Sequence, residues 1–177
     1  MTVAGWAVVR MSIPPRMASD VRERSLRAAN VLALALPLAL IAGALGSQYV
    51  GGLYPCEMCH WQRWPHYAAI PVAALGFLLP TLRRSLVVLA AALIAVSGAI
   101  GVFHAGVEYG WWQGFTTCTS TFRPTGSTAD VLGQIMAAPM IRCDVAQWTL
   151  GGVSLAGFNA ILSLGGAAAI LWLARAK

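Results

Sequence analysis

Long apolar runs separated by short charged segments dominate the sequence. The stretches without Asp, Glu, Lys or Arg are residues 28–56, 64–82, 85–107 and 145–174. Each can hold a helix of about 20 residues, which crosses a hydrocarbon core about 30 Å thick. The runs are continuous and lack the roughly ten-residue alternating segments of membrane barrels. We therefore predict an all-α membrane protein, a four-transmembrane-helix bundle. The expected spans are residues 31–50, 64–80, 85–104 and 149–173.

The composition agrees with a chain embedded in lipid. Of its 177 residues, 58% are hydrophobic and 10% are charged, and the mean hydropathy is +0.69. Four spans of about 20 residues each leave room only for loops, so one membrane domain over residues 28–174 is expected. The net charge of +6 would suit nucleic acid. The charges lie at the ends of the apolar runs, however, which favours membrane lipid as the partner and no nucleic acid.

Basic residues distinguish the two sides of the membrane. An even number of spans puts both termini on one side, together with nine of the twelve basic residues. These are Arg10, Arg16, Arg22, Arg24, Arg27, Arg83, Arg84, Arg175 and Lys177. The opposite side holds Arg63, Arg123 and Arg142. The positive-inside rule then places both termini in the cytoplasm and the loops 51–63 and 106–147 outside, in the periplasm if the membrane is a bacterial inner membrane.

The N-terminal segment allows more than one interpretation. Residues 1–27 are expected to form a basic, disordered cytoplasmic tail, and residues 175–177 the other cytoplasmic end. Translation could start at Met1, Met11 or Met17. The first apolar run also has features of a secretory signal peptide, but it is longer than the usual apolar region of about 7–15 residues.

The first cysteine pair lies in a Cys-x-x-Cys motif directly before the second span. Cys56 and Cys59 are separated by Glu57 and Met58. Amides at a helix start stabilise a thiolate and can lower a thiol pKa from about 8.5 to roughly 3.5–7.5. A disulfide across so short a loop would constrain the unfolded chain little, so a structural staple explains this pair poorly. The motif indicates a redox-active pair.

The second pair, Cys118 and Cys143, is separated by 24 residues within a loop of 37 residues. All four cysteines fall on the outward side, which in a bacterial inner membrane is the oxidising side. Two structural disulfides are the simpler interpretation. A long exposed loop can, however, offer a sulfur to a soluble partner, as thiol exchange requires. Two pairs in two environments suggest a relay.

Arg63 and the histidines are candidate binding residues for an electron acceptor such as a membrane quinone. If the second helix begins near Cys56, then Cys59, Arg63 and His66 share one face. The charge of Arg63 would stabilise the Cys59 thiolate and a reduced quinone; an interfacial anchor is the alternative. His104 could hydrogen-bond a quinone carbonyl from a similar depth, or be a packed histidine. His60 and His66 are weaker candidates.

The outward loops also contain aromatic residues near the spans and one short apolar segment. Aromatic residues flank the spans and are typical of an interfacial belt: Trp61, Trp64, Tyr67, Trp111, Trp112 and Phe115. Residues 131–140 are apolar but too short to span, which predicts a short interfacial helix in the second periplasmic loop or a cover over the first pair.

Two competing functions remain open at this point. Cys56-Glu57-Met58-Cys59-His60 matches the Cys-x-x-Cys-His pattern of covalent haem attachment, which would make the chain a membrane-anchored c-type cytochrome. All four cysteines could instead hold a structural zinc ion and make the chain a membrane scaffold. The second cysteine pair speaks against the haem, and the oxidising side speaks against the zinc.

Taken together, the motifs resemble those of the disulfide-bond formation protein B (DsbB) family of quinone-linked thiol oxidases. The resemblance covers residues 28–174. It is carried by Cys56 to Cys59 with Arg63, by His104-Ala105-Gly106-Val107-Glu108 with Trp111-Trp112, and by Cys118, Cys143-Asp144 and Trp148. Vitamin K epoxide reductases are less similar, because their loop cysteines precede the Cys-x-x-Cys pair. The long basic tail, Cys59-His60 and the sequence from His104 to Trp112 depart from the better-known DsbB pattern, which leaves the partner open.

The resemblance implies catalytic roles for Cys56, Cys59, Cys118 and Cys143. A reduced DsbA-like partner of thioredoxin fold would attack Cys118, and the freed Cys143 would attack Cys56. Cys59 would then be released as a thiolate beside a ubiquinone or menaquinone, with Arg63, His104 and His66 as cofactor-binding candidates. No resident metal is implied.

Overall fold

A computed structural model describes residues 15–114, 125–137 and 141–175. Five helices and a two-stranded hairpin occur in these residues. The elements are α1 (Pro15–Tyr49), α2 (Glu57–Leu78), α3 (Arg83–Glu108), α4 (Thr128–Ala137), β1 (Thr149–Leu150), β2 (Val153–Ser154) and α5 (Leu155–Ala174). The chain is a mainly helical membrane protein.

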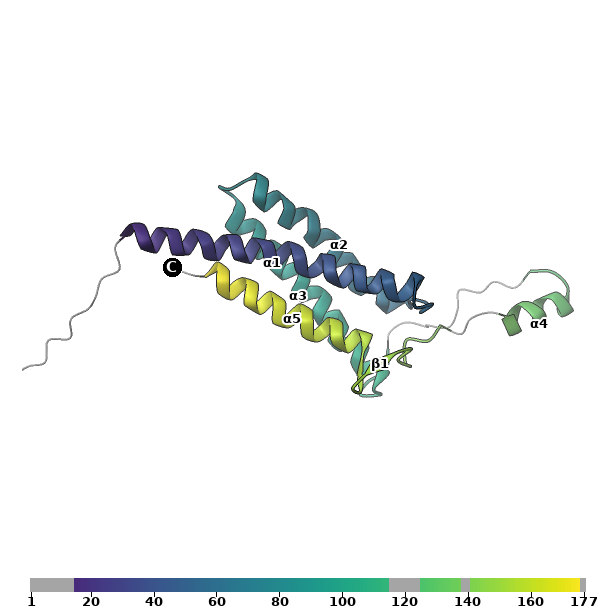
Figure 1. The fold of residues 1–177 in the computed structure, drawn as a ribbon. Helices are drawn as coiled ribbons and strands as arrows, with labels where there is room; N and C mark the ends of the chain where they lie inside the picture. The colour runs from purple at the N-terminus through teal and green to yellow at the C-terminus, as the bar shows by residue number, and fades with distance from the viewer. Residues whose placement is uncertain (1–14, 115–124, 138–140, 176–177) are drawn as a thin grey trace, which may run out of the picture.

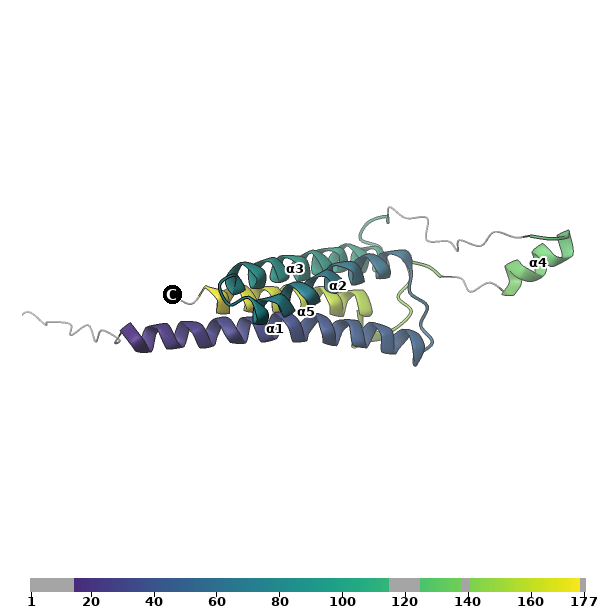
Figure 2. The same ribbon diagram turned by 90° about the horizontal axis from the view of Figure 1, so that it is seen from above.

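Four long helices lie side by side, with the start of α1 and the end of α5 at the same end of the bundle (Figures 1 and 2). Both α1 and α3 pack against α2 and α5, so α1 and α3 face each other across the bundle. Successive long helices run in opposite directions (Figure 1). This arrangement brings the starts of α2 and α5 to the same end as the finish of α3.

Among the described residues, three helices are long and apolar enough to cross a membrane: α1 from Ser19, α3 and α5. α2 lies between them with a similar length of 22 residues. Its first half carries Gln62, Arg63 and His66, all buried, which lower its hydropathy. A crossing by α2 therefore stays a prediction.

Small side chains form the core near the start of α1 and the end of α5. We call this the alanine half; its buried residues include Ala29, Ala33, Ala69, Ala73, Ala90, Ala91 and Ala167. Between α3 and α5 the helices approach closely, because a Cβ on Gly98 would lie 2.8 Å from Cγ of Leu164. Lipid-embedded helices associate through such small-residue contacts, since no hydrophobic effect drives them together.

The first helix begins earlier than expected. Residues 15–27, assigned above to a disordered tail, form the first turns of α1. Glu23 accepts hydrogen bonds from Arg27 Nε at 2.8 Å and from the buried Arg83 at 2.5 Å. This ion pairing stabilises helical turns that are too polar to be recognised as a span. Residues 1–14 lie outside the described part.

The last helix begins later than the expected residue 149. Residues 149–154 form an antiparallel hairpin in which Thr149 pairs with Ser154. Gly151 and Gly152 have φ of 59° and 80°, the left-handed values that a two-residue hairpin turn requires. Ser154 then caps α5 by accepting a hydrogen bond from the Gly157 amide at 3.1 Å.

Helix α4 overlaps the short helix expected at residues 131–140, of which residues 138–140 lie outside the described part. Leu132 and Met136 on α4 are exposed. Its contact with a membrane stays a prediction. The aromatic belt also stays a prediction, with Trp61, Trp64 and Trp111 exposed and Phe115 outside the described part.

Candidate thiol-redox site

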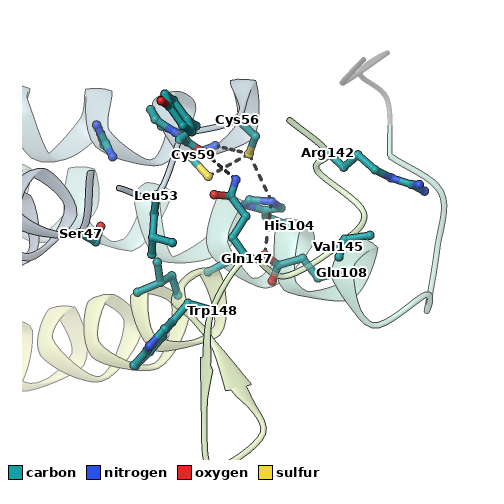
Figure 3. A pocket seen from close by; sticks show the side chains of 15 residues that line it. Ser47, Leu53, Cys56, Cys59, His104, Glu108, Arg142, Val145, Gln147 and Trp148 are labelled. Atoms are coloured by element: carbon teal, nitrogen blue, oxygen red, sulfur yellow. Dashed lines mark hydrogen bonds and ion pairs between the residues drawn. The ribbon is translucent and has the colours of Figure 1, made fainter. Parts of the chain in front are cut away.

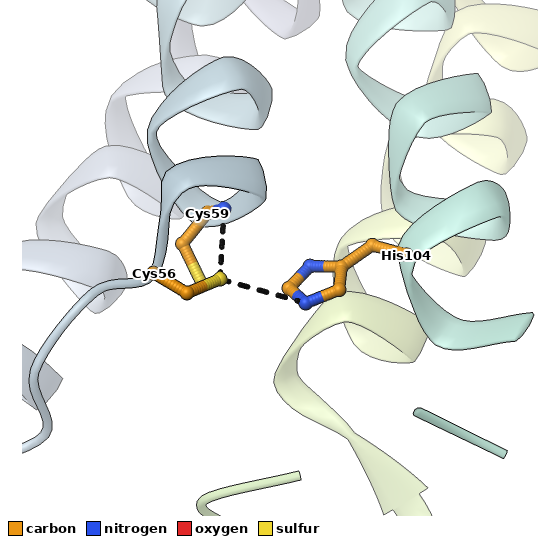
Figure 4. A group of neighbouring side chains, drawn as sticks. All are labelled: Cys56, Cys59 and His104. Carbon is orange, nitrogen blue, oxygen red and sulfur yellow. Dashed lines mark hydrogen bonds between the residues drawn. The ribbon is translucent and has the colours of Figure 1, made fainter. Parts of the chain in front are cut away.

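Cys56 is the residue that caps the start of α2. Its Sγ accepts a hydrogen bond from the Cys59 amide at 3.2 Å, the role that Ser, Thr, Asp or Asn usually has. Cys56 and Cys59 are free cysteines, with Sγ atoms 2.9 Å apart (Figure 4). The motif therefore opens a helix, as expected, and the pair is present as a dithiol.

The two thiols of this pair differ in acidity. The hydrogen bond to Cys59 and burial raise the pKa of Cys56. The hydrogen bond from Cys56 lowers the pKa of Cys59, and the Cys56–Cys59 backbone contact and the positive charge of Arg63 lower it further. Cys59 is thus the sulfur that ionises first, and Cys56 is its hydrogen-bond donor.

Cys143 packs beside the first pair. Cys56, Met58, Val107 and Cys143 form one buried cluster, in which Cys56 is 2% and Cys143 is 3% exposed. Cys143 is disulfide-bonded, and Cys118 lies outside the described residues. The expectation of an exposed second pair thus does not apply to Cys143. Three of the four cysteines lie in or against one cluster.

His104 faces Cys56 from the end of α3. Its Nε2 lies 3.6 Å from Cys56 Sγ and 3.7 Å from Oε1 of Glu108 (Figures 3 and 4). Its Nδ1 lies 2.7 Å from Nε2 of Gln62, which also donates to the Met58 carbonyl at 3.2 Å. An amide nitrogen only donates, so His104 carries its proton on Nε2, the nitrogen near Cys56 and Glu108, and the ring also hydrogen-bonds the backbone of Cys143.

Glu108 was quoted above only as part of a motif, yet its carboxylate is a buried group of the site. The side chain is 7% exposed and accepts a hydrogen bond from Ser154. The sequence signal for Glu108 was a carboxylate placed directly at the end of an apolar run.

Tyr109 holds the hairpin in place, because its hydroxyl donates to Gly152 O and accepts from the Ser154 amide, both at 2.9 Å.

A small cavity of about 50 Å³ opens beside the first pair. Cys56, Cys59, His104 and Glu108 line it from the bundle, and Arg142 and Gln147 line it from the segment that follows (Figure 3). Gln147 donates to the Tyr54 carbonyl at 2.6 Å, which joins this segment to the approach to α2. The cavity therefore connects the first pair with the chain around Cys143.

A second cavity, of about 410 Å³, lies between α1, α2 and α5. Cys59, Arg63 and His66 all line it, so the face expected from helical spacing is present. Most of its other lining is apolar: Leu36, Leu40, Ile41, Phe158 and Leu162. His104 does not line this cavity and lies at the small one instead.

Arg63 is tied to the end of α1. It is 9% exposed and donates to Gln48 Oε1 at 2.6 Å and to the Ala44 carbonyl at 3.2 Å. These bonds hold a positive charge at the large cavity and lower the cost of burying it. Gln48 was not anticipated from the sequence.

A buried polar network continues from Gln62 into the bundle. Asn159 donates to Gln62 Oε1 at 2.9 Å and to Ser97 Oγ at 3.1 Å, and its Oδ1 lies 3.1 Å from His66 Nε2. Ser163 donates to the same Oδ1 at 3.0 Å. Sequence analysis missed Gln62, Ser97 and Asn159, although uncharged polar residues inside apolar runs are the available signal.

His66 has one ring nitrogen without a partner. Ser97 donates its hydroxyl proton to the Gln62 carbonyl at 2.7 Å, so His66 Nε2 is left to donate and Nδ1 carries the lone pair. Nδ1 is buried and has no hydrogen-bond partner among the described residues. Buried polar atoms are normally satisfied, so a ligand atom in the adjoining cavity would complete this group.

The sequence matches a known protein family. The family described as "Disulfide bond formation protein DsbB" matches residues 26–173. A protein of Rickettsia prowazekii (strain Madrid E), described as "Uncharacterized protein RP370", is 22% identical over 137 residues, which are 76% of this chain and 80% of that protein. No solved structure matches. The match runs from within α1 to residue 173 in α5 and includes both cysteine pairs, and the chain therefore belongs to the DsbB family of membrane thiol oxidoreductases.

Proposed function

We propose that this protein reoxidises a periplasmic DsbA-like thiol oxidase and passes the electrons to a membrane quinone. Four spans would cross a bacterial inner membrane, with both termini in the cytoplasm and the cysteines in the periplasm. Cys59 carries the proposal, because it lines both the small cavity near Cys143 and the large apolar cavity. Electrons can thus enter the first pair from one side and leave it on the other.

The exchange sequence balances at each step. The partner's dithiol reduces the Cys118–Cys143 disulfide and becomes a disulfide itself. Cys143 then attacks Cys56 of an oxidised first pair, which releases Cys59 as a thiolate. Resolution restores the Cys118–Cys143 disulfide and leaves the first pair as a dithiol. Its two electrons and two protons convert one quinone to quinol. A free first pair with Cys143 in a disulfide is the combination that precedes this last step.

The large cavity suits a quinone ring. Its volume of about 410 Å³ lies within the usual range of roughly 300–1,000 Å³ for small-molecule sites. Arg63 offers a fixed positive charge to an oxygen that becomes negative on reduction. The lone pair on His66 Nδ1 offers an acceptor for the hydroxyl of the quinol product.

His104 takes a different proposed role from the one first expected. Its Nε2 lies 3.6 Å from Cys56 Sγ, so its proton would stabilise the Cys56 thiolate that is released when Cys118 attacks Cys143 in the mixed disulfide. Arg63 and His66 then remain as the quinone-binding candidates. Gln62 would be the positioning residue that sets the proton location on His104.

Anaerobic mixing of purified protein with quinone and a reduced dithiol partner tests the function directly. We expect one quinol for each partner disulfide formed. Cys118→Ser should stop partner oxidation, while a pre-reduced first pair still reduces quinone once. If both Cys118→Ser and Cys56→Ser oxidise the partner normally, the cysteines have a structural role only, and the proposal is refuted.

Two measurements, of the absorption spectrum and of the zinc content, would decide between the proposal and its alternatives. A Soret band in the purified protein would establish the c-type cytochrome, for which His60 would be the axial ligand. One zinc per chain that is lost in every cysteine variant would establish the four-cysteine scaffold. Cys56 is buried and His60 is exposed, an arrangement that favours thiol chemistry over haem attachment.

A further inference from the structure

Three metal-binding side chains meet at the first pair. The Sγ atoms of Cys56 and Cys59 and a ring nitrogen of His104 all lie within 4.8 Å of one another (Figure 4). Cys56 and His104 are both 2% exposed. We propose that the reduced pair and His104 form a binding site for a thiophilic divalent cation of the zinc class, and that oxidation of the pair abolishes the site.

The distance between Cys56 and His104 is close to that in a tetrahedral zinc site, whereas the distance between the two sulfurs is shorter. Zn–S bonds of about 2.3 Å and Zn–N bonds of about 2.0–2.1 Å put sulfur and nitrogen about 3.5 Å apart, and two sulfurs about 3.8 Å apart. Cys56 Sγ and His104 Nε2 are 3.6 Å apart. The sulfurs, at 2.9 Å, must separate by roughly 0.9 Å to reach that geometry. A small rotation of the half-buried Cys59 side chain provides this movement.

Glu108 lies outside the group of donors within 4.8 Å of one another, and would become a fourth donor only by moving closer to the sulfurs. Its Oε1 lies 3.7 Å from His104 Nε2. Ser154 donates to the other carboxylate oxygen and so orients the group, as second-layer partners of metal ligands do. Two thiolates and one carboxylate exceed the charge of a divalent cation by one, and the neighbouring Arg63 offsets that excess.

The imidazole must change its proton position when a metal binds. Gln62 donates to Nδ1 of His104, which leaves the proton on Nε2. A metal at Nε2 requires the proton on Nδ1, so the Gln62 carboxamide has to turn its oxygen to this nitrogen. Gln62→Glu supplies such an acceptor directly and should tighten metal binding about tenfold. No gain in affinity would refute Nε2 as the ligand atom.

This donor set differs from the four-cysteine site considered above. Cys143 is disulfide-bonded and therefore has no thiolate to offer. His104 and Glu108 take the places of Cys118 and Cys143. The first pair can then bind a metal while the second pair stays oxidised.

Metal binding would compete with turnover. The cation displaces two thiol protons and occupies both sulfurs, so the pair can neither attack a disulfide nor pass electrons on until a chelator removes the metal. This consequence depends on the proposed function, whereas the binding itself does not. The expected result is a redox pair that excess periplasmic zinc inhibits reversibly.

A titration of the full chain in detergent tests the site. The protein is reduced with a phosphine that does not chelate metals, freed of the reductant without oxygen, and titrated with Zn²⁺ against a chromophoric chelator. We expect one ion per chain and at least 100-fold weaker binding after oxidation of the pair. Co²⁺ should give a thiolate charge-transfer band and strong tetrahedral d–d bands. Equal affinity of the oxidised chain, or octahedral Co²⁺ spectra, would refute the site.

Matched variants assign the ligands. Cys59→Ser and His104→Ala should weaken binding at least tenfold, and His104→Gln serves if the alanine variant unfolds. His60→Ala removes an exposed histidine next to the pair and should leave the affinity unchanged. A double Cys118→Ser, Cys143→Ser variant should keep the site. Loss of binding in that double variant alone would refute our donor set and support the four-cysteine site.

A parallel measurement separates this proposal from the proposed function. Zn²⁺ at the concentration that saturates the reduced chain should stop quinol formation, and a chelator should restore it. Zinc binding by a chain that never reduces quinone would refute the proposed function and leave the metal site standing. Full quinol formation by a zinc-saturated chain would refute the competition.

Discussion

The two halves of the bundle differ in what fills the space between the helices. The alanine half is packed with small apolar side chains and has Arg83 and Glu23 at its margin. The other half, which we call the cysteine half, has thiol, polar and charged side chains between its helices: Cys56, Cys59, Gln62, Arg63, His66 and His104. Polar groups within a membrane bundle cost free energy, and their concentration in one half marks where chemistry takes place.

The largest effect that this comparison predicts is on turnover. Cys59→Ser removes the only sulfur that lines both cavities among the described residues, and it should lower the rate of quinol formation by on the order of 10³ or more. Thermal unfolding should hardly change, because serine is nearly isosteric. A stable variant with full turnover would contradict the assignment of chemistry to this half.

Arg63 and Arg83, both buried, should respond differently to substitution. Arg63→Ala should raise the quinone KM about tenfold to a hundredfold, since a positive charge at the large cavity is lost. Arg83→Ala should leave that KM unchanged and lower the free energy of unfolding by about 1–3 kcal/mol, because Glu23 and the Gly76 carbonyl lose a charged donor. Quinol kinetics and thermal unfolding of both variants measure this. Unchanged quinone kinetics in Arg63→Ala would show that Arg63 is only an interfacial anchor.

Close packing predicts a smaller effect on stability. Gly98→Ala would bring a Cβ to 2.8 Å from Leu164 and 3.0 Å from Ser163, and should destabilise the bundle by about 1–3 kcal/mol. Gly165→Ala meets nothing within 4 Å and should stabilise α5 by roughly 0.5–1 kcal/mol. Thermal unfolding in detergent compares the pair. Equal midpoints would show that the helices do not approach as closely as described.

The smallest predicted effect is a shift in the pH dependence of alkylation. The hydrogen bond from Cys56 lowers the pKa of Cys59, so the Cys59 thiolate should form at a lower pH than the thiolate of an ordinary cysteine. Iodoacetamide should therefore modify Cys59 before Cys56 as the pH rises, and mass mapping of quenched samples would show the order. Modification of Cys56 first would reverse the proposed roles of the two sulfurs.

Much of the fold follows from the lengths of the apolar runs. Each of the four apolar runs that is long enough to cross a membrane forms most of one long helix. Their ends were harder to predict, because hydropathy cannot detect a charged helix such as residues 15–27, which Glu23 stabilises through ion pairs. The hairpin was hidden within an apolar run, where only the Gly151-Gly152 turn signals it.

The site could be predicted in part from helical spacing alone. Cys59, Arg63 and His66 do line one cavity, since positions three and four apart share a helix face. The contacts of His104 with Cys56 and of Asn159 with Gln62 join different helices. Such contacts depend on the rotation of each helix about its axis, which a single sequence leaves open.

The length of α1 has a consequence for how the protein sits in its membrane. Thirty-five residues make a rod of about 52 Å. Even tilted by about 40°, it would extend some 40 Å along the bilayer normal, beyond the roughly 30 Å of hydrocarbon. Its first turns, with Arg16, Arg22, Arg24 and Arg27, must therefore stand among the lipid headgroups. If the termini are cytoplasmic, anionic phospholipids there would anchor each guanidinium by about 1 kcal/mol and fix the depth at which the thiols meet the opposite leaflet.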